Sequence, residues 1–136
     1  MASQSEGKRS SRAQTRRPRL YKISEEMKAW AAALEAEVLS WPQVTAKPMF
    51  GFLAVYRKGK IFAALPRTRT MNTPNSVAFK LESPSARIRQ RIERDPRIHA
   101  AEFAQARWMT CEMSTDADLR QALYWLNQAY GSAGGA

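Results

Sequence analysis

Bulky apolar residues alternate with smaller ones on both sides of a short basic turn near the middle of the chain. The two runs are residues 47–56 and 61–65, and the turn between them is Arg57-Lys58-Gly59-Lys60. A period of two places every second side chain on the same face of a strand, and a glycine in a polar turn lets two such strands fold back on each other. This stretch therefore predicts a β-hairpin. On one face of its first strand we expect Phe50, Phe52, Ala54 and Tyr56, and since the other face is also apolar, both should be at least partly covered.

Helical and strand patterns follow one another around this hairpin. Apolar residues spaced three or four apart predict helices over residues 24–40, 84–94 and 115–130. Alternation predicts further strands over residues 77–81 and 107–113. The expected order is helix, hairpin, strand, helix, strand, helix, which indicates an α+β fold, a small antiparallel sheet with helices packed on one side.

Hydroxyl residues mark the expected helix starts. Ser24 precedes two glutamates, which the positive end of a helix dipole favours. Ser83 precedes Pro84, a residue suited to the first helical position. Thr115 stands three residues before Asp118 and approximates a capping box.

Positive charge is concentrated near the N-terminus. The 136 residues carry a net charge of +10, and residues 1–22 alone contain seven basic residues against one acidic residue. This segment is also rich in Ser, Gln and Thr and nearly empty of apolar residues before Leu20, so it cannot bury enough surface to offset the entropy of ordering it. We expect a disordered basic tail over residues 1–22, one α+β domain over residues 23–131 and a flexible tail over residues 132–136.

Cations that could contact phosphate occur in the tail and in three parts of the expected domain. The hairpin turn exposes basic residues at its tip, and an irregular loop over residues 67–75 carries two arginines among hydroxyl and amide side chains. On the helix that starts near Pro84, Arg87 and Arg91 share a face, with Arg94 one turn further. A solvated surface is the alternative interpretation for each group. The candidate nucleic-acid-binding residues are Arg9, Arg12, Arg16, Arg17, Arg19, Arg57, Lys58, Lys60, Arg67, Arg69, Arg87, Arg91 and Arg94.

Catalytic and metal-binding motifs are absent from the sequence. The chain has one cysteine, Cys111, and one histidine, His99, so neither an intramolecular disulfide nor a Cys/His zinc cluster is possible. We expect Cys111 to be a small buried strand residue and His99 a polar surface residue in a loop. General acid–base or nucleophilic catalysis needs a poised pair of groups, so we expect no enzymatic activity, no cofactor and no metal.

Several short motifs together carry a family resemblance. They are Lys47-Pro48-Met49-Phe50-Gly51, Gly59-Lys60-Ile61-Phe62-Ala63, Phe79-Lys80-Leu81, Trp108-Met109 and Leu126-Asn127-Gln128-Ala129-Tyr130. Because of these motifs, residues 23–131 resemble the TfoX N-terminal domain and the YjbR (MmcQ-like) family. The resemblance implies a small bacterial α+β domain. For TfoX it implies a link to the regulation of competence for DNA uptake, and for YjbR a likeness to double-winged DNA-binding domains.

Two classes of function remain open at this stage. The first is a non-enzymatic DNA-binding or regulatory protein that uses its basic tail and basic surface, with DNA rather than RNA as the expected partner. The second is a module that binds a protein or a small ligand and has no role with nucleic acid. No apolar run approaches the roughly 20 residues that cross a bilayer, and the first residues lack the apolar segment of a secretory signal. We therefore expect a cytoplasmic protein without a membrane partner, as a monomer or weak dimer.

Overall fold

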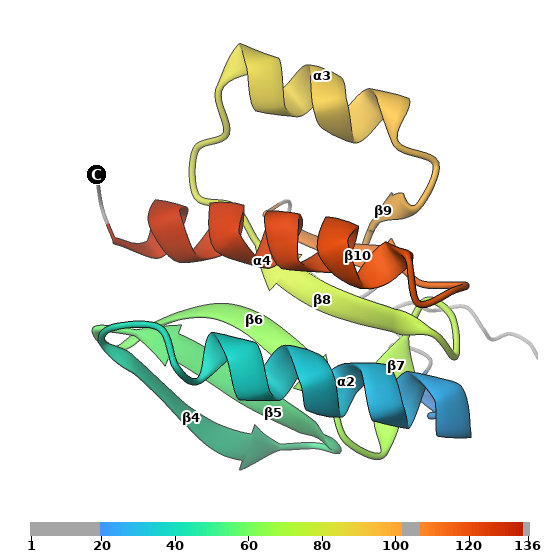
Figure 1. Ribbon diagram of the computed structural model, residues 1–136. Coiled ribbons are helices and arrows are strands. Elements are labelled where there is room, and N and C mark those ends of the chain that lie inside the picture. The colour runs from blue at the N-terminus through green and yellow to red at the C-terminus, as the bar shows by residue number, and fades with distance from the viewer. Residues whose placement is uncertain (1–19, 102–106, 135–136) are drawn as a thin grey trace, which may run out of the picture.

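The computed structural model describes residues 20–101 and 107–134 and has an α+β architecture (Figure 1). Its elements, in chain order, are β3 (Leu20–Lys22), α2 (Glu25–Val38), β4 (Val44–Met49), β5 (Phe52–Arg57), β6 (Lys60–Pro66), β7 (Arg69–Met71), β8 (Ser76–Lys80), α3 (Ala86–Arg94), β9 (Ile98–Ala100), β10 (Trp108–Glu112) and α4 (Asp118–Ala133).

Six strands form one antiparallel sheet in the order β4-β5-β6-β8-β10-β9, and β3 pairs with β7 in a separate ribbon. The predicted hairpin is confirmed as β5 and β6, and the predicted strands over residues 77–81 and 107–113 are confirmed as β8 and β10. The helices α2 and α4 lie side by side over one face of the large sheet, as expected for this fold class (Figure 1).

The main core lies between these two helices and the sheet. Leu34 of α2, Phe62 of β6, Phe79 of β8 and Trp125 of α4 are among its largest fully buried side chains. The rings of Phe79 and Trp125 stack with centroids 5.8 Å apart. The opposite face of the sheet carries a second cluster, in which Phe52 and the β7 residue Met71 take part. Both faces of the sheet are therefore covered, as the apolar pattern predicted.

The first expected strand is in fact two strands joined by a tight turn. The chain reverses at Phe50-Gly51, between β4 and β5, and both turn residues have positive φ. Phe50 is therefore a turn residue with 85% of its surface exposed, and the prediction that it lies on a sheet face is wrong.

Three short strands were also missed. Leu20–Lys22 of the expected tail form β3, which pairs with Arg69–Met71 inside the expected irregular loop, and Ile98–Ala100 form β9 at one edge of the sheet. Strands of three residues are too short to show an alternating pattern. Residues 1–19, with most of the predicted tail, lie outside the described residues.

Helix boundaries differ from the predictions at three places, while the predicted cap at Ser24 is confirmed. The N-cap of α3 is Ser85 rather than Ser83, since the Ser85 hydroxyl accepts a hydrogen bond from the backbone N–H of Ile88. The N-cap of α4 is Ala117, without a side-chain cap, so the prediction of a cap at Thr115 is wrong; the Asp118 carboxylate nevertheless accepts a hydrogen bond from the N–H of Thr115. At its other end α4 continues to Ala133, past the expected helix end at residue 130 and into the expected flexible tail.

Candidate nucleic-acid interface

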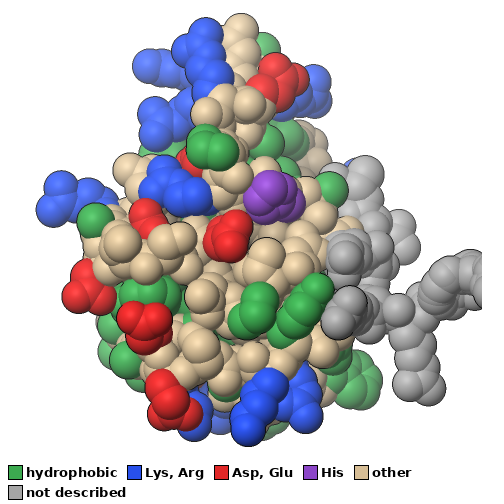
Figure 2. Space-filling view, turned by 90° about the vertical axis from the view of Figure 1, so that its right-hand side faces the viewer, with side chains coloured by type: hydrophobic (Ala, Val, Ile, Leu, Met, Phe, Trp, Pro, Cys, Tyr) green, Lys and Arg blue, Asp and Glu red, His purple; other side chains and the backbone are tan. Residues whose placement is uncertain are grey.

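The helix α3 carries a basic ridge, which we define as Arg87, Arg91 and Arg94. No residue of α3 is buried, and only Ile88 and Ile92 are packed partly against the main core. The arginines of the ridge are exposed, and among the described residues no carboxylate forms an ion pair with them. In Figure 2, Lys and Arg side chains gather at the end of the molecule where α3 lies. These charges are therefore available to an external anion.

One contact fixes the middle of the ridge. The Arg91 guanidinium lies over the Tyr124 ring of α4, 4.4 Å from its centroid. A cation–π contact of this kind keeps the charge on the arginine while restricting its position. The ridge is thus oriented against α4 without being neutralised.

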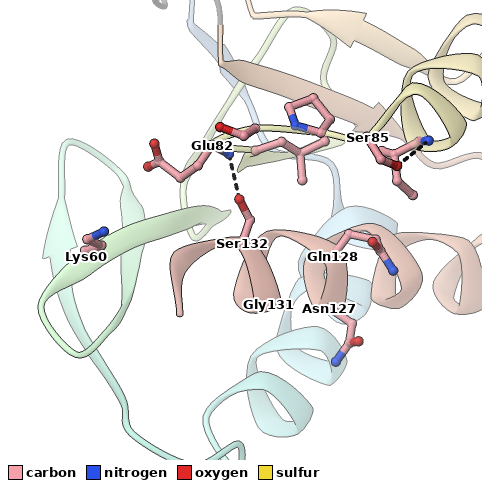
Figure 3. Close-up of a pocket in the computed structure, with 11 residues that line it drawn as sticks. Lys60, Glu82, Ser85, Asn127, Gln128, Gly131 and Ser132 are labelled. Carbon is pink, nitrogen blue, oxygen red and sulfur yellow. Dashed lines mark hydrogen bonds between the residues drawn. The ribbon is translucent and has the colours of Figure 1, made fainter. Parts of the chain in front are cut away.

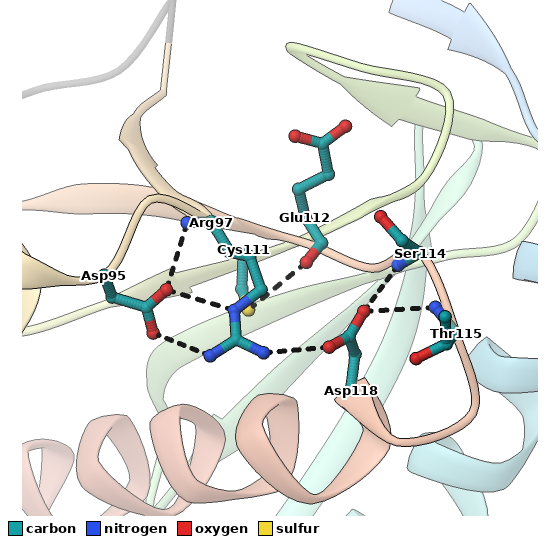
Figure 4. A network of polar contacts seen from close by, with 7 residues as sticks. All are labelled: Asp95, Arg97, Cys111, Glu112, Ser114, Thr115 and Asp118. Carbon is teal, nitrogen blue, oxygen red and sulfur yellow. Dashed lines mark hydrogen bonds and ion pairs between the residues drawn. The ribbon is translucent and has the colours of Figure 1, made fainter.

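A network of charged groups ties the C-terminal end of α3 to the start of α4 (Figure 4). Arg97 Nε lies 3.0 Å from Asp95 Oδ1, at the end of α3, and Arg97 Nη1 lies 2.8 Å from Asp118 Oδ1. Burial raises the pKa of both carboxyls, but hydrogen bonds from Arg97 and, for Asp118, from the N–H groups of Ser114 and Thr115 outweigh it, so both pKa values lie below their usual range. Arg97 was not singled out from the sequence, because its partners become neighbours only in the fold.

A cleft of about 590 Å³ opens at the other end of α3 (Figure 3). Its walls are the link from β8 to α3, the last turns of α4 and the side chain of Lys60. On one wall the Ser132 hydroxyl accepts a hydrogen bond of 2.7 Å from the backbone N–H of Glu82. Polar groups of Asn127 and Gln128 also line the cleft. Nothing in the sequence indicated it, since it joins segments about 50 residues apart.

The basic residues predicted at the hairpin tip differ in their contacts. Arg57 donates from Nη1 to the Tyr130 carbonyl at 3.0 Å, and its guanidinium lies 4.1 Å from the Tyr130 ring centroid. These contacts tie β5 to α4 and favour a structural role for Arg57. Lys58 and Lys60 are exposed, and Lys60 also lines the cleft at the start of α3.

The two predicted arginines of the 67–75 loop also differ. Arg67 forms an ion pair with Glu35 of α2, with 2.9 Å between Nη2 and Oε1. Arg69 is exposed on β7, and among the described residues its guanidinium donates a hydrogen bond only to the neighbouring Thr68 carbonyl. Within the described part of the chain Arg69 therefore has no carboxylate partner, whereas Arg67 has one.

The predicted binding residues do not form a single surface. The ridge of α3 lies at one end of the molecule, and the connection from β6 to β7, with Arg67 and Arg69, lies at the other (Figure 1). Arg9, Arg12, Arg16, Arg17 and Arg19 lie outside the described residues. Each group of cations must be considered by itself.

The candidates for other chemistry are accounted for by packing. Cys111 is buried, and burial raises the pKa of its thiol to about 12, so it stays protonated and unreactive at neutral pH. His99 is exposed, as expected, but lies on β9 rather than in a loop. Residues 20–101 and 107–134 contain no cluster of three or more His, Cys, Asp or Glu side chains suited to a metal ion. The same residues include no helix long and apolar enough to cross a membrane.

Comparisons with models of protein families, with curated proteins and with solved structures find nothing that matches this chain.

Proposed function

We propose that this chain is a non-enzymatic, regulatory protein that binds DNA through phosphate contacts made by the basic ridge of α3. The observation that carries the proposal is the set of exposed arginines on α3 without carboxylate partners among the described residues. Lys and Arg side chains that neutralise phosphates release counterions and give affinity that does not depend on sequence. The resemblance to the TfoX and YjbR families supports DNA as the partner.

The spacing of the ridge suits a phosphate backbone. Arg87 and Arg91 are about 6 Å apart along the helix axis, and Arg94 adds about 4.5 Å more. Each strand of duplex DNA presents a phosphate about every 3.4 Å of axis, so the ridge spans several phosphates.

The test is binding of a fluorescently labelled DNA duplex to the full chain across a salt series. Replacing two ridge residues, Arg87→Gln with Arg94→Gln, should lower the slope of log K against log salt by about 1.8, since each phosphate contact contributes about 0.9. A matched control removes two charges elsewhere, Lys28→Gln on α2 with Lys47→Gln on β4. The strand β4 is at the sheet edge opposite β9, so the control should leave the slope unchanged.

A second set of variants separates the ridge from the tail. Replacing Arg9, Arg12, Arg16, Arg17 and Arg19 with Gln should weaken binding but leave an affinity that still depends on the ridge. If the duplex does not bind, or if binding vanishes with the tail charges and ignores the ridge, the proposal is wrong.

The cleft at the start of α3 supports a second candidate, a small-ligand-binding module. Its volume of about 590 Å³ is within the usual range for ligand pockets, and its lining is rich in polar groups. A ligand found by thermal-shift screening of polar metabolites should lose its effect in Asn127→Ala with Gln128→Ala. Retention of the shift in that double variant would place the ligand elsewhere.

A further inference from the structure

The turn between β4 and β5 has an unusual residue at its first position. Met49 pairs with Phe52, so the turn has two residues, Phe50 with φ of 49° and Gly51 with φ of 87°. Positive φ at both positions is the pattern of a type I′ turn, for which Asn-Gly is the preferred sequence. A bulky residue is strained in this region of backbone space. Local stability alone would not select phenylalanine here.

Burial of the Phe50 side chain does not offset this backbone strain. The side chain is 85% exposed, the highest fraction among the exposed large hydrophobic residues of the described chain. A strained residue that breaks a local rule without an internal contact is typical of a functional position. The ring is therefore free to contact another molecule.

The turn that carries this ring is held firmly. The Gly51 carbonyl accepts hydrogen bonds from three successive backbone N–H groups, those of Arg67, Thr68 and Arg69, at 3.0, 2.9 and 3.2 Å. The chain also approaches Gly51 closely, because a Cβ placed there would lie 2.8 Å from Arg69 Cγ and 2.9 Å from Thr68 Oγ1. Phe50 is thus presented on a backbone whose position is set before any partner arrives, which lowers the entropy cost of binding.

Positive charge without a carboxylate partner among the described residues lies beside the turn, where Arg69 packs against Gly51. In the β3–β7 ribbon Lys22 stands directly opposite Arg69, an arrangement of like charges that destabilises a sheet. Both side chains are exposed, and among the described residues no carboxylate forms an ion pair with either. Six further basic residues lie in the 19 residues that precede β3 in the sequence. The charge favours an anionic partner over a neutral or basic protein surface.

We infer that this tip patch, formed by Phe50, Lys22 and Arg69, binds single-stranded nucleic acid, with an unpaired base stacked on the Phe50 ring and adjacent phosphates against Lys22 and Arg69. Every base has a face that can stack on an aromatic ring, and a groove or patch of cations holds the backbone. A paired base would first have to leave its stack, which costs a few kcal/mol, so the single strand is the better ligand. The inference rests on the proposed function for the class of polymer, but it uses a different surface from the ridge.

The experiment compares three labelled 12-mers with the full chain: oligodeoxythymidylate, oligouridylate, and a strand of abasic sites with the same phosphates. A stacked base is worth about 1–3 kcal/mol, so the chain should bind the deoxythymidylate strand roughly tenfold more tightly than the abasic strand. The uridylate arm tells whether the patch distinguishes DNA from RNA, and equal binding of the two fits stacking on either base.

Phe50→Asn should abolish the preference for bases over abasic sites, because asparagine suits the turn but has no ring. Phe50→Tyr should keep it. Lys58→Asn, the same replacement at the corresponding position of the β5–β6 turn, serves as the matched control and should keep it as well. Lys22→Gln with Arg69→Gln should weaken binding of both strands alike and lower the salt slope by about 1.4.

The outcomes distinguish this inference from the proposed function. Equal affinity of the unchanged chain for the base-bearing and abasic strands, or an unchanged preference in Phe50→Asn, overturns stacking and points to a protein as the partner of Phe50. If duplex binding still depends on the ridge in that case, the proposed function stands alone. If neither duplex nor single strand binds, both are wrong.

Discussion

The two regions that could meet nucleic acid, the basic ridge of α3 and the tip patch, are built in opposite ways. The ridge is a row of charges on a helix without a buried residue, held by the Arg91–Tyr124 contact, by partial packing of two isoleucines and by the network at Arg97. The tip is a two-residue turn clamped by three backbone hydrogen bonds to one carbonyl. Attraction between charges has little directional requirement and tolerates a loosely packed helix, whereas stacking needs a ring in a fixed place.

This difference predicts different local stabilities. Segments with few buried apolar contacts open at a lower free energy than the core does. We expect α3 to open without the rest of the domain, and the β4–β5 turn to open only when the sheet does.

The largest effect should come from Gly51→Ala. The new Cβ would lie 2.8 Å from Arg69 Cγ at a residue with φ of 87°, so both a clash and backbone strain would result. We expect a loss of about 2–3 kcal/mol in the free energy of unfolding, measured by urea titration. Gly59→Ala is the matched control, since Gly59 has φ of 82° and nothing within 4 Å of a Cβ, and it should cost only about 1 kcal/mol. Equal losses would show that the close approach of Arg69 and Thr68 to Gly51 adds no cost beyond the backbone strain.

A smaller effect is expected at the network that anchors α3. Arg97→Gln removes charge-assisted hydrogen bonds to Asp95 and Asp118, and since these groups are partly exposed we expect a loss of about 1–2 kcal/mol at pH 7. Both carboxyls have pKa values below their usual range in the folded chain, so their contribution is complete above the unfolded value of about 3.9. It is lost as the pH falls below about 4 through the folded pKa values.

The pH dependence supplies the control for this prediction. Urea titrations at pH 7 and pH 3 should show that the difference between Arg97→Gln and the unchanged chain narrows in acid. A difference that is the same at both pH values would mean that Arg97 acts by packing rather than through its two carboxylates.

Removing the N-cap of α3 should test whether this helix opens independently of the core. Ser85→Ala removes the hydrogen bond from the Ile88 N–H, at a cost of about 1 kcal/mol to the helix, and should speed amide hydrogen exchange about fivefold within α3 alone. Ser24→Ala in α2 removes the corresponding cap and also a bond to Asn75, and should lower the global stability. If Ser85→Ala also speeds exchange throughout the core, α3 is not an independently opening unit.

Periodicity predicted the parts of this fold that are long and internally regular. The hairpin β5–β6, the strands β8 and β10 and the helix α2 with its Ser24 cap all follow from local patterns. The pairing of β3 with β7 joins residues about 50 apart and spans three residues in each strand, so no local pattern could show it. The burial of Trp125 was missed as well, although it belongs to the stripe of α4 that faces the sheet.

The candidate sites show the same limit. Helical spacing predicted the ridge, because residues four apart share a face whatever the helix packs against. The roles of Arg57 and Arg67 could not be predicted, since Tyr130 and Glu35 reach them only in the fold. The sequence did not indicate the turn at Phe50-Gly51, because its first residue is a bulky aromatic that continues the apolar alternation expected of a strand. Asparagine is the residue that usually marks the first position of such a turn.

The smallest effect, and the one with the opposite sign, should come from Phe50→Asn. Asparagine tolerates the left-handed backbone region better than phenylalanine does and is the preferred partner of glycine in a type I′ turn. Since Phe50 is 85% exposed, the replacement gives up almost no burial, and we expect the free energy of unfolding to rise by about 0.5–1 kcal/mol in urea titration. Lys58→Asn, at the equivalent position of the other turn with φ of 50°, should give a similar small gain. A loss of stability in Phe50→Asn alone would mean that the ring supports the fold, and its exposure would then say little about binding. A gain in both variants would mean that the Phe50 ring, like the Lys58 side chain, adds nothing to the stability of its turn, so the fold does not require an aromatic residue there.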